Sequence, residues 1–172
     1  MIWRVVRQIA KVGIATEPAP DIGEAAQAEA SHIQAELLSI LGQSLSIREV
    51  DTGSCNGCEK EISALGNHYY NLEGLGIKFV ASPRHADMLL VTGPVSRNME
   101  MALKRTYEAT PEPKLVVAVG DCACDGGIFG ESYATCGRVD KVIPVDVIVP
   151  GCPPEPVEIL RGILLAVRRR IQ

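Results

Sequence analysis

Aromatic residues are scarce in this chain, at 4% of its 172 residues with a single tryptophan. No apolar run reaches the roughly 20 residues that a membrane-spanning helix needs. The formal net charge is only -4, so the basic footprint of a nucleic-acid-binding protein is missing. The first residues lack the apolar segment and small-residue cleavage site of a signal peptide. The sequence therefore predicts a globular protein of the cytoplasm that binds no nucleic acid.

What the chain does contain is an apolar fraction of 47%, enough for a buried core, and six cysteines. The cytoplasm keeps thiols reduced, so cysteines in a chain without an export signal favour metal or redox chemistry over a disulfide framework. Glycines and prolines cluster around these cysteines, which indicates loops of defined shape. The cysteines are therefore the first place to look for function.

The N-terminal part, residues 1–44, has a pattern of its own. Apolar residues recur at helical spacing over residues 2–13, with basic residues on another face. This predicts a basic amphipathic helix, which lies on an anionic membrane surface, docks on a partner subunit or packs on its own domain. A proline-containing linker at residues 17–20 follows, and residues 24–41 predict a second helix.

From residue 45 onward, short apolar runs alternate with helical segments. The predicted strands are Leu45–Val50, Ile77–Ala81, Met88–Thr92, Leu115–Gly120 and Val145–Val149. The predicted helices are Glu59–Tyr70, Arg97–Thr110 and Glu155–Arg170. The third and fourth strands are apolar on both faces, as in parallel sheets covered by helices. We therefore predict an α/β domain over residues 45–172, with an open, doubly wound, mostly parallel sheet of the flavodoxin-like type.

Four cysteines directly follow predicted strands. Cys55 and Cys58 come after the first strand, Cys122 after the fourth and Cys152 after the fifth. The carboxyl ends of parallel strands share one edge of the sheet, so these residues should converge although they lie far apart in sequence. Four thiolates at one place make a metal site.

The spacing leaves several kinds of site open. A Cys-x-x-Cys pair such as Cys55-Asn56-Gly57-Cys58 occurs in redox dithiols and in zinc sites. Structural zinc sites commonly use two short-spaced pairs, whereas here one pair is joined by two isolated cysteines. This favours an iron-sulfur cluster over a zinc-stabilised binding module, with a thioredoxin-like dithiol third. A flavin site is disfavoured because the segment Gly53–Cys58 offers few hydroxyls for a phosphate.

Cys124 and Cys136 are left over. Cys124 forms a Cys-x-Cys with Cys122, a spacing that seldom lets both sulfurs take neighbouring corners of one cubane, and Cys122 lies directly at the strand end. Cys136 is predicted to be a buried, small apolar residue.

Glycines flank the four cysteines in the sequence. Gly57, Gly120 and Gly151 lie next to or close to them and should let backbone N–H groups approach the cluster sulfurs.

The stretch from Val50 to Ile171 resembles the family of the complex I 20 kDa subunits and the small subunits of nickel-iron hydrogenases. The residues that carry the resemblance are Cys55-Asn56-Gly57-Cys58 with Glu61, Ser82-Pro83-Arg84-His85-Ala86-Asp87, Gly120-Asp121-Cys122-Ala123, Ile143-Pro144-Val145-Asp146-Val147 and Pro150-Gly151-Cys152-Pro153-Pro154. The resemblance implies one 4Fe-4S cluster held by Cys55, Cys58, Cys122 and Cys152. These are the same four cysteines that the predicted topology brings together.

The spacing of the first two cysteines indicates which branch of this family the chain resembles. Complex I members have two adjacent cysteines where this chain has Cys55-Asn56-Gly57-Cys58, which is the hydrogenase form. Thr92-Gly93-Pro94-Val95 resembles the group 4, energy-converting hydrogenases, including the formate hydrogenlyase type. Exported hydrogenases carry a twin-arginine signal and a C-terminal extension with two further clusters, and this sequence has neither.

The resemblance implies an electron-transfer subunit without catalytic residues of its own. Its expected partners are a large nickel-iron catalytic subunit, a ferredoxin-like iron-sulfur subunit and integral membrane subunits. The expected place is peripheral, on the cytoplasmic face of the inner membrane. The alternative is the equivalent cluster subunit of a complex I-like quinone oxidoreductase.

Two charged residues are expected beside the cluster. Glu61 matches the family's acidic position and either couples proton movement to reduction or is a solvated carboxylate in the first helix turn. Arg84 precedes a strand and is a weaker expectation, together with His85. Glu59 is expected to be an exposed helix residue.

Overall fold

The computed structural model describes residues 3, 7, 35 and 44–169. The helix, linker and second helix predicted for residues 1–44 thus lie almost entirely outside the described residues. The domain predicted from residue 45 onward is described nearly to its end.

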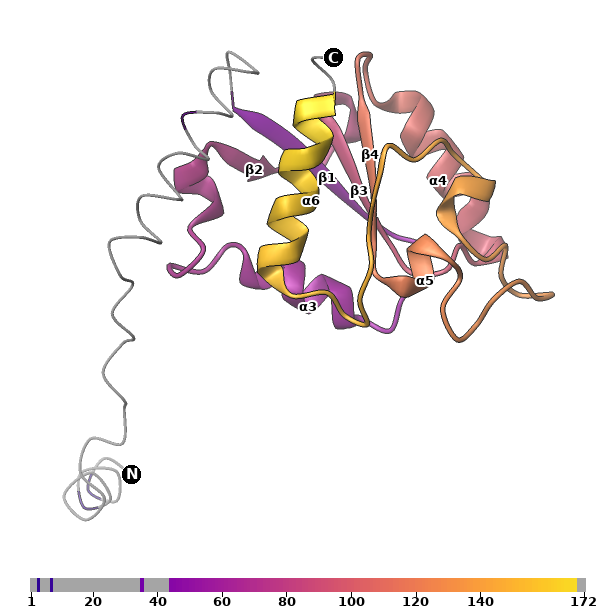
Figure 1. Cartoon of the computed structure of the whole chain (residues 1–172), viewed down its shortest axis with the longest axis horizontal. Helices are drawn as coiled ribbons and strands as arrows, with labels where there is room; N and C mark the ends of the chain where they lie inside the picture. Colours follow the sequence, from indigo (N-terminus) through magenta and orange to yellow (C-terminus); the bar gives the residue numbers. More distant parts are fainter. Residues whose placement is uncertain (1–2, 4–6, 8–34, 36–43, 170–172) are drawn as a thin grey trace.

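A five-stranded sheet forms the centre of the domain, with the strand order β2-β1-β3-β4-β5 (Figure 1). All neighbouring strands are parallel. The strands are β1 (Leu45–Asp51), β2 (Ile77–Phe79), β3 (Met88–Thr92), β4 (Leu115–Val119) and β5 (Val147–Val149). The predicted doubly wound α/β fold is confirmed, since this strand order is the flavodoxin-like one.

Helices cover both faces of the sheet. The helices are α3 (Gly57–Ala64), α4 (Arg97–Ala109), α5 (Asp121–Cys124) and α6 (Pro156–Arg169), with short 3-10 turns η1 (Leu72–Leu75), η2 (Pro83–His85) and η3 (Val139–Lys141). On one face, Ile62 of α3 and Ile159 of α6 join the buried side chains of the strands. On the other face, Leu103 of α4 and Ala123 of α5 do so. Strands β3 and β4 are consequently buried along their whole length.

Among the elements that differ from their predicted bounds, two do so for identifiable local reasons. The helix predicted to reach Tyr70 ends at Ala64, because the Asn67 side chain accepts hydrogen bonds from the backbone N–H groups of Tyr69 and Tyr70 and holds a turn there. Strand β5 begins at Val147 rather than two residues earlier. Just before it, the Asp146 carboxylate accepts the backbone N–H of Val116 at 2.7 Å and replaces a regular strand hydrogen bond.

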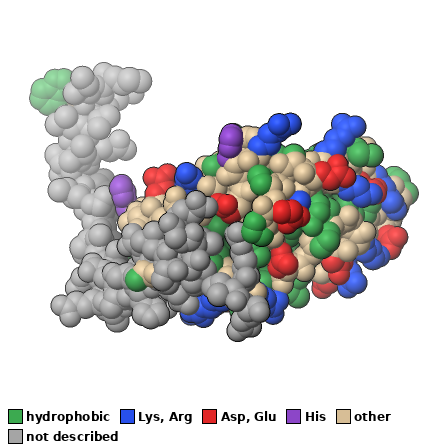
Figure 2. All heavy atoms as spheres, turned by 90° about the horizontal axis from the view of Figure 1, so that it is seen from above, with side chains coloured by type: hydrophobic (Ala, Val, Ile, Leu, Met, Phe, Trp, Pro, Cys, Tyr) green, Lys and Arg blue, Asp and Glu red, His purple; other side chains and the backbone are tan. Residues whose placement is uncertain are grey.

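The parallel arrangement gives the sheet one carboxyl edge, at the bottom of Figure 1, where α3 and α5 begin. The opposite, amino edge is the side seen in Figure 2, where basic and acidic side chains are interspersed. Within the described part of the chain, no helix has the length and apolar character needed to cross a bilayer. The loops of the carboxyl edge therefore carry the chemistry predicted from the sequence.

Candidate metal centre

The four predicted ligand cysteines lie on three loops of the carboxyl edge. Cys55 is on the connection from β1 into α3, Cys58 is in the first turn of α3, Cys122 is in the first turn of α5 after β4, and Cys152 follows β5. Burial raises the pKa of the Cys58 thiol to about 12, and repulsion from nearby negative groups adds to the effect. These groups are Glu59 and then the thiolates of Cys122, Cys55 and Cys152. The Cys58 thiol is therefore within electrostatic reach of the other three.

Hydrogen bonds fix the first loop, which carries Cys55 and Cys58. The Asp51 carboxylate accepts the backbone N–H groups of Gly53 and Ser54, both at 2.8 Å. The buried Thr52 hydroxyl donates to the carbonyl of Thr92 at 2.6 Å. The loop is thus held against the end of β3 by bonds that involve no cysteine.

The loops of Cys122 and Cys152 are joined to each other. The backbone N–H of Asp121 donates to the Gly151 carbonyl at 2.8 Å, and the backbone N–H of Gly151 donates to the Asp121 carboxylate at 2.6 Å. This reciprocal pair connects the residues that immediately precede the two cysteines. The separation of their backbones is thereby set by the fold.

Glycine is required where the loops approach the sulfurs most closely. Gly120 has a φ of 89°, and a Cβ atom there would lie 2.5 Å from Cys58 Sγ. Gly127 has a φ of 52°, and its Cβ would lie 2.9 Å from Cys122 Sγ. Both distances are too short for any side chain, so the backbone itself lines this part of the site. The predicted close approach at Gly120 agrees with this geometry.

The two remaining predicted glycines play less direct parts. A Cβ on Gly57 would be 3.5 Å from Cys55 Sγ, an ordinary contact. Gly151 has a φ of 134°, and its Cβ would meet Pro154 Cα at 2.6 Å rather than a sulfur. Gly151 is therefore needed for the turn at Cys152 and Gly57 is not sterically required.

The thiols of the two spare cysteines have contacts other than the four predicted ligands. The Cys124 thiol contacts the carbonyls of Ala118 at 3.6 Å and Val149 at 3.5 Å, both strand residues. The Cys136 thiol is buried and donates to the Glu100 carboxylate at 3.3 Å. This geometry supports the choice of Cys122 over Cys124 as a ligand.

Glu59 lies at this edge in a position that the sequence pattern does not indicate. Its Oε1 accepts a hydrogen bond from Ser54 Oγ at 2.6 Å and a second, short one from Thr92 Oγ1. Its Oε2 is buried and has no hydrogen-bond partner among the described residues. The expectation that Glu59 is simply exposed is therefore wrong. The missing information is the strand register. Asp51 pairs with Thr92, and this pairing places the Thr92 hydroxyl at the end of β3, beside the cysteine loop.

Glu61 lies two residues further along α3 and faces a different neighbourhood. The pKa of Tyr70 is raised by burial first and then by Tyr69, Glu155 and Glu61. Among the described residues, no hydrogen bond joins Glu61 to the cysteine loops. Its predicted place beside the cluster thus receives less structural support than that of Glu59.

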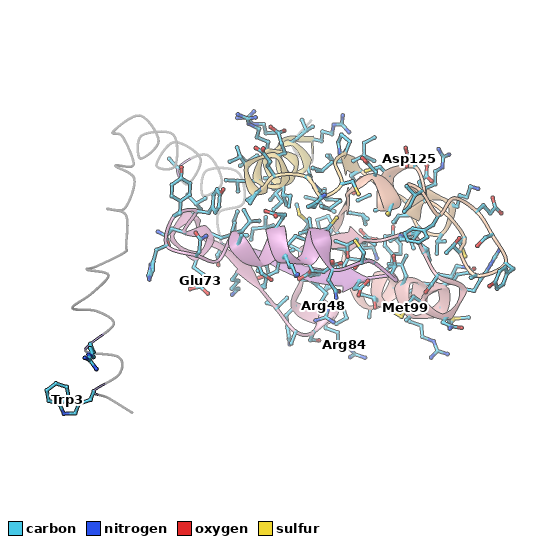
Figure 3. The ribbon with its side chains drawn as sticks, turned by 90° about the horizontal axis from the view of Figure 1, so that it is seen from below. Trp3, Arg48, Glu73, Arg84, Met99 and Asp125 are labelled. Atoms are coloured by element: carbon cyan, nitrogen blue, oxygen red, sulfur yellow. The ribbon has the colours of Figure 1, made fainter. Side chains whose placement is uncertain are left out.

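Arg84 does not lie at the carboxyl edge. It is an exposed residue of η2, which connects the end of β2 to the start of β3. Both of those strand ends pair with Ile47, in the amino-terminal half of β1. Figure 3, which looks onto the carboxyl edge, shows Arg84 and Asp125 on opposite sides of the domain. The expectation that Arg84 lies beside the cluster is not supported by this geometry. Arg84 precedes β3 and lies near the amino end of that strand, whereas the four cysteines follow the carboxyl ends of strands.

The residues present fit an iron-sulfur cluster. Thiolates are the usual ligands of such clusters, and all four cysteines are free. Cys55 and Cys152 are exposed, whereas Cys58 and Cys122 are partly buried, so the edge is open on one side and shielded on the other. Among the described residues, no three His, Cys, Asp or Glu side chains are grouped to hold a single metal ion. A cubane takes its thiolates at four separate corners and does not require such a group.

Comparisons with known proteins agree with these observations. The model of the family described as NADH ubiquinone oxidoreductase, 20 Kd subunit, matches residues 55–166. The chain is 49% identical over 135 residues to the probable membrane-bound hydrogenase subunit mbhJ of Pyrococcus furiosus, covering 78% of this chain and 81% of that one. It is 45% identical over 134 residues to formate hydrogenlyase subunit 7 of Escherichia coli, covering 78% of this chain and 52% of the relative.

A solved structure shows the same fold. A chain in the structure of the membrane-bound sulfane sulfur reductase, an archaeal respiratory membrane complex, superposes with a TM-score of 0.64 at 35% identity. The superposition covers 81% of this chain and 75% of that chain.

Proposed function

Because this chain belongs to the family of the 20 kDa subunit of NADH ubiquinone oxidoreductase, we propose that it is an electron-transfer subunit of a membrane-associated oxidoreductase complex. In this proposal it carries one 4Fe-4S cluster on Cys55, Cys58, Cys122 and Cys152. The family resemblance predicted from the sequence is confirmed by this membership.

One observation supports the cluster above all others. The four cysteines follow β1, β4 and β5 at one edge of the sheet, and the segments that carry them are held by hydrogen bonds of their own. A site built by chance from scattered cysteines would not need glycine at the points of closest approach. The donor set is that of an iron-sulfur cluster, with no oxygen or nitrogen ligand among the four.

When bound, the cluster supplies a site that gains and loses single electrons. The work of the chain is to hold and insulate that site. Burial on the sheet side of Cys58 and Cys122 excludes water, while exposed Cys55 and Cys152 face outward. The outward side is where we expect electrons to pass to and from partner subunits.

We propose a group 4, energy-converting hydrogenase as the complex, in which electrons pass between a ferredoxin-like subunit and a large nickel-iron subunit. Integral membrane subunits would place the chain on the cytoplasmic face of the inner membrane. The names of the Pyrococcus furiosus and Escherichia coli relatives support this choice. So does the Cys-x-x-Cys form of the first ligand pair.

A complex without hydrogenase chemistry is the second candidate function. The family model is named for a ubiquinone oxidoreductase, and the sulfane sulfur reductase belongs to a respiratory membrane complex. Purifying the native complex and assaying hydrogen turnover against quinone-dependent oxidation separates the two. Hydrogen evolution supports the hydrogenase, whereas quinone reduction without hydrogen turnover supports the second candidate.

The cluster itself is tested on the full chain purified without oxygen. We expect about four iron and four sulfide per chain and the broad visible absorption of sulfur-to-iron charge transfer. Replacing Cys152 by Ser should remove most of the iron. Zinc without iron or sulfide would instead establish a zinc-stabilised binding module and overturn the proposal.

A further inference from the structure

Glu59 occupies an unusual position for a carboxylate that directly follows a ligand cysteine. Its Oε1 accepts hydrogen bonds from two hydroxyls on different segments, Ser54 in the cysteine loop and Thr92 at the end of β3. Ser54 Oγ in turn accepts the backbone N–H of Asn56 at 3.2 Å. The side chain therefore bridges the loop that carries Cys55 and Cys58 to the neighbouring strand.

The Glu59 carboxylate is held by hydroxyl groups and not by a cation of the described residues. None of the ion pairs between described residues involves Glu59. Its second oxygen is buried without a partner, so solvent screens it incompletely. This carboxylate lies beside the ligands, because Glu59 directly follows Cys58 and its Oε1 accepts the hydroxyl of Ser54, which directly precedes Cys55.

We propose that Glu59 is a positioning residue with two separable effects on the cluster site. Its hydrogen bonds hold the Cys55–Cys58 loop on the end of β3, and its fixed negative charge lowers the reduction potential of the bound cluster. The second effect follows from electrostatics, because reduction adds an electron next to a charge of the same sign. This inference rests on the proposed function only in that a cluster is bound at these cysteines.

Substitutions in the chain separate the two effects. In Glu59→Gln, the side-chain carbonyl still accepts from Ser54 and Thr92, so the bridge remains and the charge is lost. In Thr92→Val, the fully buried hydroxyl is replaced by a methyl group of similar size, so the charge remains and the bridge is broken. Glu61→Gln is the matched control, since it removes the same charge from the same helix two residues away.

The first measurement is a redox titration of the loaded full chain, followed by electron paramagnetic resonance. Glu59→Gln should raise the ratio of reduced to oxidised cluster about tenfold at a fixed potential, equivalent to about 59 mV for one electron. Glu61→Gln should change the logarithm of the ratio of reduced to oxidised cluster by less than half as much. An unchanged ratio in Glu59→Gln, or an equal shift in Glu61→Gln, overturns the charge effect.

The second measurement needs no cluster. Amide hydrogen exchange over residues 53–58 of the cluster-free full chain should become several-fold faster in Thr92→Val and change little in Glu59→Gln and Glu61→Gln. Unchanged exchange in Thr92→Val overturns the bridge. A wild-type chain that binds no iron or sulfide removes the proposed function and the charge effect together, whereas a loaded chain with equal potentials removes only the latter.

Discussion

Gly120 provides the most direct test of the site geometry. It connects β4 to α5 with φ 89° and ψ 153°, a region of backbone conformation that is essentially restricted to glycine. A Cβ atom there would lie 2.5 Å from Cys58 Sγ. Gly120→Ala therefore imposes backbone strain of about 1–3 kcal/mol and also displaces a ligand sulfur.

A second glycine supplies the matched control. Gly76 directly precedes β2. It has φ 78° and ψ 20°, and a Cβ atom there would meet nothing within 4 Å. Gly76→Ala thus adds left-handed strain of about 1–2 kcal/mol and no clash. In a domain of this size each kcal/mol lowers the melting temperature by about 2–4 °C.

The assay combines thermal unfolding of the cluster-free chain with iron analysis of the loaded chain. We expect Gly76→Ala to lower the melting temperature by about 2–8 °C and to retain its iron. Gly120→Ala should lower it by about 2–12 °C and lose most of the iron. Full iron content in Gly120→Ala would show that Cys58 does not hold the cluster in the position described, and the reasoning about this edge would fail.

Three further predictions follow from individual contacts. Cys122→Ser should lose most of the iron while Cys124→Ser retains it, and the reverse result would reassign the ligand. Asp121→Ala should speed iron loss to a chelator several-fold, whereas Asp121→Asn, which can still accept the Gly151 N–H, should not; equal rates would refute a role for that bond. The pKa of Glu49 is raised, mainly by burial and then by Glu59. The charged form of Glu49 therefore destabilises the folded state as the pH rises above 4.5, the ordinary pKa of this side chain. Glu49→Gln should therefore raise the melting temperature at pH 7, with a gain that shrinks toward pH 4.5, and a constant gain would contradict this assignment.

The fold was predictable because its signals are local and strong. Strands such as Met88–Thr92 are apolar on both faces, and this pattern alone indicates a covered parallel sheet. Such a sheet brings its carboxyl ends to one edge, so the convergence of cysteines from positions 55 to 152 followed from chain order. No knowledge of side-chain geometry was needed for that step.

The remaining details depended on contacts that no periodicity encodes. The end of α3 is decided by the Asn67 side chain, and the start of β5 by Asp146. Choosing between Glu59 and Glu61 required knowing which side of α3 faces Thr92. The place of Arg84 was open to prediction from chain order, because a residue that precedes a parallel strand such as β3 lies at its amino end, away from the cysteines that follow the strands.

The hydrogen bonds that hold the cysteine loops involve backbone groups and side chains of the chain alone, such as Asp121 with Gly151 and Thr52 with Thr92. The conformational entropy of ordering these loops is therefore lost when the polypeptide folds and not when inorganic iron and sulfide arrive. Under the proposed function, a folded apoprotein would then receive a cofactor delivered from outside. In this respect the chain would differ from small zinc domains, whose folding waits for the metal.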